Sequence, residues 1–344
     1  MTIRVLVVDD SPTMRAILMA RLEAERDIAV VATAGHAVEA RELIKRLDPD
    51  VVTLDIEMPG MNGLDFLEKI MTLRPTPVIV VSGSTREGTE TTARALALGA
   101  IECYAKTDRA GGLGLDDHGR LAALIREAAQ VRFDRRWPVA PAVARDAPGP
   151  ARAAAAMIAV GASTGGVEAL QTLLAGFPAR CPPTLIVQHV NPRFAAAIAR
   201  TLDAATAAGV VMAEAEMPLV PGTIYLAPGG DRHLVAGARS DGGAPCCRLV
   251  EGDPVTGHRP SVDVLFHSVA RHAGARGIGI LLTGMGADGA DGLLAMSRAG
   301  AQTIAQDEAT STVFGMPRAA IALGAARVVA PLGRIAHHAL RDAA

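Results

Sequence analysis

Short apolar runs recur at regular intervals through the first 130 residues. They cover residues 3–8, 28–33, 51–55, 77–82 and 101–105. The segments between them carry apolar residues at helical spacing, such as Met14, Ile17, Leu18 and Leu22. Buried strands that alternate with helices of this length are typical of a doubly wound parallel sheet. Five strands predict the flavodoxin-like order, in which the functional site lies at the carboxyl ends of the strands.

The alternation stops at residues 131–156, which are rich in Pro, Ala and Arg. Such a segment predicts an interdomain linker that is semi-stiff where prolines cluster. Apolar runs resume after it as MIAVGAS, TLIVQHV, GTIYLAP and GIGILLTGMG. We therefore expect two α/β domains with parallel sheets, over residues 1–130 and 157–344.

Composition narrows the class of protein. The chain has 344 residues, a formal net charge of −2 and four cysteines without C-x-x-C spacing. This charge argues against nucleic acid as the main partner, and the cysteine pattern predicts neither a zinc site nor a disulfide framework. The acidic residues in the opening MTIRVLVVDD argue against a signal peptide, and no apolar run is long enough to span a membrane. The sequence predicts a cytoplasmic protein with no membrane insertion.

Five polar residues follow strands of the first predicted sheet. Asp9 and Asp10 follow the first strand, Asp55 ends the third, Ser82 ends the fourth and Lys106 follows the fifth. Carboxylates that converge on one sheet edge repel one another unless a cation intervenes, and Mg²⁺ prefers such oxygen ligands. Any one of these aspartates would more often be a helix cap or a solvated side chain. The five together predict a site at which one of the aspartates becomes phosphorylated.

The stretches VLVVDDSPTMR, VTLDIEMPGMNGLDFL and VIVVSGS resemble the receiver domain of two-component response regulators. The resemblance covers about residues 1–125. It implies that Asp55 is phosphorylated and that Asp9, Asp10 and Asp55 hold Mg²⁺. It also implies that Lys106 contacts the phosphoryl group and that Ser82 responds to it.

Two positions depart from the receiver pattern. Thr107 follows the lysine where a proline is common, and Cys103 occupies the position of the aromatic switch residue, with Tyr104 adjacent. The phosphoacceptor is intact, but the relay from hydroxyl to aromatic residue is put in doubt.

The loop GASTGG, residues 161–166, allows two interpretations. A dinucleotide-binding loop reads G-x-G-x-x-G, but Ser163 stands at its middle glycine, where a side chain hinders the approach of a pyrophosphate. The next apolar run ends in Gln188 and His189, not in the acidic residue that binds a ribose. The same loop contains G-x-S-x-G, a strand-to-helix turn that exposes a nucleophilic serine.

A nucleophilic serine needs a base and an acid on the same edge of the sheet. His189 follows the run TLIVQ, and Asp288 follows ILLTGMGA, so both can meet Ser163 there. His233 and His258 also lie in loops and compete for the role of base, while Asp291 competes with Asp288. The order Ser, His, Asp differs from that of ordinary α/β-hydrolases, so the residues alone leave these alternatives open.

The motifs GASTGG, QHVNPRF, GHRPSVDVLF, LLTGMGADGADGL and IAQDEATSTVFGMP resemble the catalytic domain of the chemotaxis protein-glutamate methylesterase family, CheB. With the receiver, the resemblance covers nearly the whole chain apart from the linker. It implies Ser163 as the nucleophile, His189 as the base and Asp288 as the acid. It further implies that Thr164 and Met285 line the oxyanion site, and it places GHRPSVD beside the catalytic pocket.

The resemblance implies a phosphorylation-activated serine hydrolase that demethylates glutamate methyl esters, releases methanol and deamidates specific glutamines. Its expected partners are the cytoplasmic domains of methylated chemoreceptors and a chemotaxis histidine kinase, in chemotactic adaptation. The ester hydrolysis needs no cofactor. Alternatives are the same chemistry on another receptor or signalling protein, a catalytically idle docking protein, and a DNA-binding output domain. The last is disfavoured because no basic helix-turn-helix pattern follows residue 130.

Overall fold

The computed structural model describes residues 2–58, 63–82, 86–106, 119–131, 155–239 and 244–340. The chain divides into two compact units, Met1–Arg135 and Arg136–Ala344, and each is described by itself. Nearly all of the predicted linker, and Thr107, lie outside the described residues.

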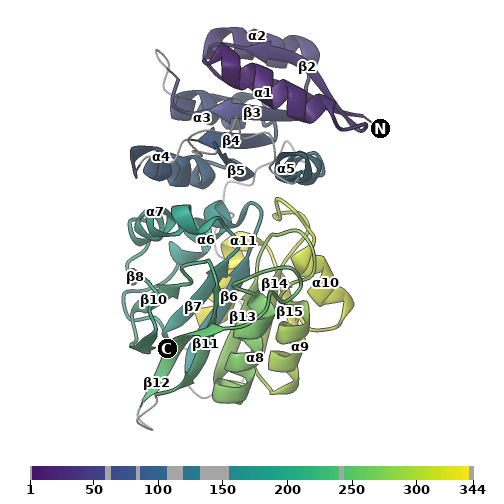
Figure 1. The fold of residues 1–344 in the computed structure, drawn as a ribbon. Coiled ribbons are helices and arrows are strands. Elements are labelled where there is room, and N and C mark those ends of the chain that lie inside the picture. Colours follow the sequence, from purple (N-terminus) through teal and green to yellow (C-terminus); the bar gives the residue numbers. More distant parts are fainter. Residues whose placement is uncertain are drawn as a thin grey trace. The chain divides into compact units, whose positions relative to one another are not determined.

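The first unit is built on a five-stranded parallel sheet with the order β2-β1-β3-β4-β5 (Figure 1). Its strands are β1 (Ile3–Val8), β2 (Ile28–Ala34), β3 (Val51–Asp55), β4 (Val78–Ser82) and β5 (Glu102–Ala105). This confirms the flavodoxin-like order, and the predicted runs match these strands to within one residue at each end. The carboxyl ends of β1 and β3 lie side by side, because these strands are neighbours in the sheet.

Helices α1 to α4 connect successive strands of this sheet, and α5 follows β5. Their bounds are α1 (Pro12–Glu23), α2 (Ala37–Leu47), α3 (Gly63–Leu73), α4 (Arg86–Ala97) and α5 (Arg120–Ala128). Helix α1 begins where Ser11 caps it, since the Ser11 side chain accepts a hydrogen bond from the Met14 N–H and Pro12 fits the first helical position. Its Leu18 and Leu22 are buried, as their spacing predicts.

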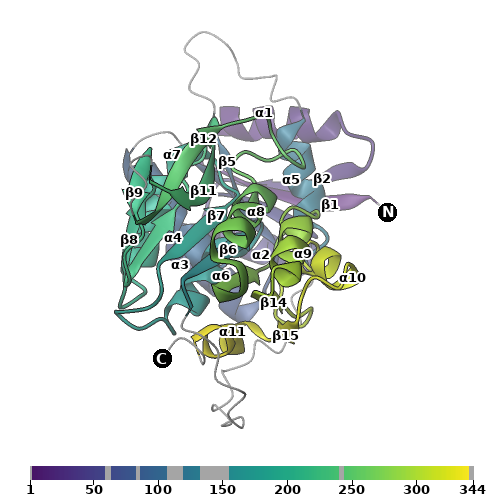
Figure 2. The same cartoon turned by 90° about the horizontal axis from the view of Figure 1, so that it is seen from below.

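The second unit contains a seven-stranded parallel sheet with the order β15-β14-β13-β6-β7-β10-β8 (Figures 1 and 2). Its strands are β6 (Met157–Ala162), β7 (Thr184–Gln188), β8 (Gly209–Met212), β10 (Thr223–Leu226), β13 (Gly277–Leu281), β14 (Gln302–Gln306) and β15 (Val328–Ala330). Six helices of this unit are α6 (Gly166–Leu174), α7 (Pro192–Asp203), α8 (Val262–Ala273), α9 (Ala290–Arg298), α10 (Met316–Ala322) and α11 (Leu332–Leu340).

A three-stranded antiparallel sheet, which the sequence pattern did not predict, accompanies the parallel one. Its order is β11-β12-β9, from Arg232–Ala238, Pro245–Glu251 and Glu216–Pro218. Leu234 and Cys247 of this sheet share a buried core with Phe266 of helix α8. The burial of these strands depends on that helix, and their short runs of small and polar residues carry no strong period.

The strand order of the large sheet reverses its direction at β6, with later strands added on both sides of it. It pairs with β7 on one side and with β13 on the other, so that Ala162 is in register with Gln188, and Gly161 with Leu281. Ligands of open α/β sheets bind at the carboxyl ends of strands at such a switch point. The loops that follow β6, β7 and β13 carry Ser163, His189 and Asp288.

Candidate active site

Ser163 follows β6 directly, and its backbone is fixed by both neighbouring strands. Its N–H donates to the Thr283 carbonyl oxygen at 3.0 Å. Its own carbonyl oxygen accepts from the Gly166 N–H at 2.7 Å and from Gln188 Nε2 at 2.8 Å. These contacts close the turn into helix α6 and fix the serine at the edge of the sheet.

The glycines around Ser163 serve close packing. Gly165 has φ +73°, a conformation that favours glycine. A Cβ on Gly166 would collide with the side-chain oxygen of Gln188, and one on Gly284 would lie 2.7 Å from Ser163 Cβ. The glycine-rich pattern therefore reflects the tight turn that carries Ser163, which favours the serine-elbow interpretation over a phosphate loop.

His189 and Asp288 are in contact although they lie 99 positions apart in the chain. His189 Nε2 lies 2.8 Å from Asp288 Oδ2, and both side chains are nearly inaccessible to solvent. An ionised carboxylate can only accept, so Nε2 carries the proton and Nδ1 bears the lone pair. Nδ1 is buried and has no hydrogen-bond partner within the described part of the chain. No hydrogen bond joins it to Ser163 Oγ there, and such contacts are often long before substrate binds.

The Asp288 carboxylate lies against the amino-terminal end of helix α8. It accepts from Ser261 Oγ at 2.7 Å, from the Val262 N–H at 2.8 Å and from the Asp263 N–H at 3.0 Å. Burial acts to raise the pKa of Asp288, but the His189 ring and these backbone N–H groups outweigh it and hold the pKa well below its usual range. Asp288 is therefore an ionised acceptor that can orient an imidazole and stabilise its positive charge.

The competing residues take other places. Asp291 pairs with His267, Oδ2 to Nε2 at 2.8 Å, on an exposed part of the unit. The His258 ring stacks on the His189 ring, with centroids 3.8 Å apart and an interplanar angle of 3°. His258 thus contacts the candidate base, whereas Asp291 has a partner outside the site.

His233 contacts Ser261, which in turn donates a hydrogen bond to Asp288. Its Nδ1 accepts from the Ser261 N–H at 3.1 Å, and its Nε2 lies 3.0 Å from the Asp253 carbonyl oxygen, to which it donates. Neither His233 nor Ser261 was assigned this role from the sequence. The available signal was a serine directly before an apolar helical run, because Ser261 is the N-cap of α8.

Thr164 and Met285 lie in the two loops that flank Ser163. The Thr164 side chain is buried, and its carbonyl oxygen accepts from Thr283 Oγ1 at 2.9 Å. Met285 follows Gly284, whose carbonyl oxygen accepts from the Met316 N–H at 2.8 Å. Among the described residues, the backbone N–H groups of Thr164 and Met285 have no acceptor, which leaves both able to bind an oxyanion.

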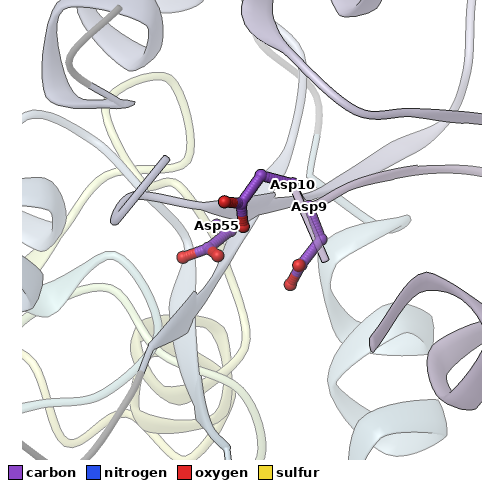
Figure 3. A group of neighbouring side chains, drawn as sticks. All are labelled: Asp9, Asp10 and Asp55. Carbon is purple, nitrogen blue, oxygen red and sulfur yellow. The ribbon is translucent and has the colours of Figure 1, made fainter. Parts of the chain in front are cut away.

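The acidic cluster of the first unit gathers as predicted (Figure 3). Asp9, Asp10 and Asp55 each offer an oxygen, and these atoms lie within 4.8 Å of one another. Lys106 Nζ lies 2.6 Å from Asp55 Oδ2 and 3.1 Å from Asp9 Oδ2. The lysine neutralises part of the charge from the side of β5.

Burial raises the pKa of Asp9, with a further contribution from Asp55. Burial acts to lower the pKa of Lys106, but its hydrogen bond to Asp55 and the two negative charges raise it overall. One lysine faces three carboxylates, so the cluster keeps unbalanced negative charge. A small divalent cation with oxygen preference fits this donor set.

The structure describes Ser82 and also Cys103, one of the two positions that depart from the receiver pattern. Ser82 is fully buried at the end of β4, where its carbonyl oxygen accepts from the Lys106 N–H at 2.7 Å. Cys103 and Tyr104 are both buried in β5, and Arg21 of α1 donates to the Tyr104 hydroxyl. The aromatic ring next to the switch position is thus tied to α1.

Two protein families match this chain in the order in which the units occur. Residues 5–111 match the response regulator receiver domain, and residues 158–339 match the CheB methylesterase family. The chain belongs to the CheB methylesterase family. A protein-glutamate methylesterase/protein-glutamine glutaminase of Rhizobium etli is 52% identical over 98% of this chain and 96% of its own length.

Further CheB relatives agree with this assignment. Proteins of the same description from Caulobacter vibrioides and Bordetella pertussis are 51% and 48% identical, over 94% and 98% of this chain and 93% and 96% of their own lengths. The crystal structure of the Thermotoga maritima CheB methylesterase catalytic domain is 33% identical and covers 55% of this chain and 98% of that domain, with a TM-score of 0.52.

Membership of the CheB family confirms the predicted fold class and the order of a receiver and a methylesterase domain. It disfavours the idle docking protein and the DNA-binding output domain. No helix in the described ranges is long and apolar enough to cross a membrane.

Proposed function

We propose that this chain is a phosphorylation-regulated protein-glutamate methylesterase and protein-glutamine glutaminase in which Ser163, His189 and Asp288 form the catalytic triad. The observation that carries the proposal is the 2.8 Å contact between His189 and Asp288 at the sheet edge that also presents Ser163. It gives the serine turn the base and acid that it needs. We assign the receiver to residues 1–130, the linker to 131–156 and the catalytic domain to 157–344.

The triad performs acyl transfer. Ser163 Oγ attacks the γ-carbonyl carbon of a glutamate methyl ester, and His189 Nδ1 takes the hydroxyl proton. Asp288 holds the imidazolium through Nε2. His189 then gives the proton to the departing methoxide, so that methanol leaves. Water, deprotonated by the same nitrogen, cleaves the acyl-enzyme to glutamate and restores Ser163. With a glutamine side chain the leaving group is ammonia.

The N–H groups of Thr164 and Met285 stabilise the negative charge that forms on the carbonyl oxygen. Both have no other acceptor within the described ranges, so they lose no hydrogen bond when the oxyanion forms. One such donor typically contributes a factor of about 10²–10³ to the rate. The hydrolysis needs no cofactor.

The first unit accepts a phosphoryl group on Asp55. Asp9, Asp10 and Asp55 would hold Mg²⁺, and the bound cation would supply positive charge for the phosphoryl oxygens. Lys106, already 2.6 Å from Asp55, binds a phosphoryl oxygen. Ser82 ends β4 beside this site and responds to the modification.

The substrates of this reaction are the cytoplasmic domains of methylated chemoreceptors, and a chemotaxis histidine kinase supplies the phosphoryl group. The protein acts in the cytoplasm, in chemotactic adaptation. No nucleic acid takes part.

Methanol release from methylated receptor membranes tests this function. The full chain is assayed with and without a small phosphodonor and Mg²⁺, next to Ser163→Ala and Asp55→Asn. We expect phosphodonor-stimulated release from the native chain, none from Ser163→Ala, and unstimulated release from Asp55→Asn. EDTA should remove the stimulation and leave the basal rate.

Release by Ser163→Ala at the native rate would contradict the triad. Native release that ignores the phosphodonor would contradict the regulation and leave the triad in place.

A further inference from the structure

We propose that His258 is a positioning residue for the base: its neutral ring, stacked on His189, fixes the plane of that imidazole and stabilises the imidazolium that forms during acyl transfer. The inference rests on the proposed function, because it assumes that His189 is the base. It adds to the triad a residue that acts through His189 without reaching the substrate.

The geometry of the stack is the first argument. The two ring centroids are 3.8 Å apart and the planes differ by 3°. Neutral aromatic pairs usually lie offset or edge to face, with centroids about 4.5–7 Å apart. A close parallel pair is favourable when one of the rings is a cation, because the negative face of the other attracts it.

The charge state of His258 fits this role. Burial lowers the pKa of His258 and the neighbouring His189 lowers it further, while Asp288 acts in the opposite direction. His258 therefore stays neutral when His189 takes up a proton. The attraction arises only when His189 is charged, so it is stronger in the transition state than in the ground state and accelerates the reaction.

A rigid turn delivers the His258 ring. Val255 and His258 exchange backbone hydrogen bonds, with N–O distances of 3.0 and 2.9 Å, across a two-residue turn. Thr256 and Gly257 in that turn have φ values of +51° and +81°. Positive φ is unusual for a β-branched residue, and strain of this kind collects at functional sites.

The chain after the turn is fixed as well. Arg259 donates from Nη1 to the Gly252 carbonyl oxygen at 2.9 Å and from Nε to the Gly230 carbonyl oxygen at 3.3 Å. Two residues later, the Ser261 N–H donates to His233. His258 is thus anchored on both sides, although its own ring has no hydrogen bond among the described residues and is held by the stack.

Three variants separate this role from simple packing. His258→Phe keeps an aromatic face and loses both ring nitrogens. His258→Leu and His258→Gln remove the face but keep part of the volume. His267→Leu is the matched control, because His267 pairs with Asp291 and not with a residue of the proposed triad.

The readout is covalent labelling of Ser163 in the full chain by a fluorophosphonate probe, with phosphodonor and Mg²⁺ present. Ser163 Oγ bonds to phosphorus, fluoride leaves, and His189 takes the proton, so the step uses the base without requiring a receptor. Saturation kinetics give the maximal labelling rate and the half-saturating probe concentration. Mass spectrometry identifies the labelled residue, and thermal unfolding checks the fold of each variant.

We expect His258→Leu and His258→Gln to lower the maximal rate roughly tenfold with an unchanged half-saturating concentration. His258→Phe and His267→Leu should stay within about threefold of the native chain. Equal rates in the native, Leu and Gln chains would overturn the proposal, and so would a loss in Phe as large as that in Leu. A native chain that is not labelled at Ser163 would instead overturn the proposed function, and the inference with it.

Discussion

Asp288 shows how a single buried charge is made tolerable. Its two oxygens accept hydrogen bonds from His189, Ser261, Val262 and Asp263. A buried carboxylate is costly unless such partners replace water. Two of the four are backbone N–H groups at a helix amino terminus, where the helix dipole also favours negative charge. The acid is fixed by the fold before any substrate arrives.

Replacing the acid tests this arrangement. In Asp288→Asn the amide cannot accept from all four donors, and it favours the wrong tautomer of His189, so we expect kcat for methanol release to fall by about 10⁴. Asp291→Asn is the control, because its partner His267 lies outside the triad, and its rate should not change. A loss smaller than tenfold in Asp288→Asn would remove Asp288 from the mechanism.

A second prediction at this scale concerns Cys247. Burial, with a smaller contribution from Cys246, raises the pKa of the Cys247 thiol to about 11. The thiolate is the reactive form, and the residue is inaccessible in β12. Iodoacetamide at pH 8 should leave Cys247 unmodified in the native protein and modify it after unfolding in guanidinium, as read by mass spectrometry. Rapid modification of the native chain would show that β12 opens.

Among the elements, the turn between β6 and α6 packs against a position, Gly284, that has no room for a side chain. Gly284, in the loop after β13, is packed between Ser163 and Met316. Its N–H and carbonyl oxygen also tie that loop to the segment 313–316. The serine is therefore positioned by two loops that meet, and one of them has room only for a hydrogen at this point.

Gly284→Ala should test this packing. The added Cβ would lie 2.7 Å from Ser163 Cβ and collide with Met316 Sδ, so we expect a loss of roughly 1–3 kcal/mol in the free energy of unfolding and a drop in activity. Gly333→Ala in α11 is the control, since no atom lies within 4 Å of its added Cβ. It should raise the free energy of unfolding by up to about 0.5 kcal/mol. Both values come from urea unfolding, and equal effects would contradict the argument.

Strands that are fully buried could be predicted from the sequence, whereas several partly buried strands could not. Runs such as 5–8 and 157–162 are buried throughout and contain no polar side chain, so the sequence pattern predicted these strands. Strands β9, β11 and β12 were missed because they are short or only partly buried. Much of their core is created by helix α8, which begins at Val262 while β11 ends at Ala238.

At the scale of the whole molecule, the chain joins a receiver domain to a methylesterase domain. The acidic cluster with Lys106 belongs to one unit and the triad to the other. The residues of the proposed triad all follow strands of one sheet, so we expect the hydrolase to assemble its site without the receiver.

A fragment that begins at about residue 150 should therefore hydrolyse receptor methyl esters without a phosphodonor. Its rate should not respond to phosphodonor or to EDTA, because both act on the first unit. The measurement is methanol release, with the unphosphorylated full chain for comparison. We attribute the proposed phosphodonor stimulation to inhibition by the unphosphorylated receiver, which predicts a fragment more active than that chain. A folded fragment that is no more active than the unphosphorylated full chain would contradict this inhibition.

The sequence by itself determined the two parallel α/β units, the strand ends that carry Asp9, Asp55, Ser163 and His189, and the resemblance to CheB. These follow from local apolar runs and from a rule of parallel sheets, in which carboxyl ends share one edge. The pairing of Asp288 with His189 was implied by the resemblance to CheB, and the residues alone left it open. Only the tertiary structure decided that the start of α8 surrounds Asp288 with hydrogen-bond donors and that His258 stacks on His189. These three sets of contacts join residues up to 99 positions apart through loops without periodic pattern, so their partners are set by how the whole unit packs.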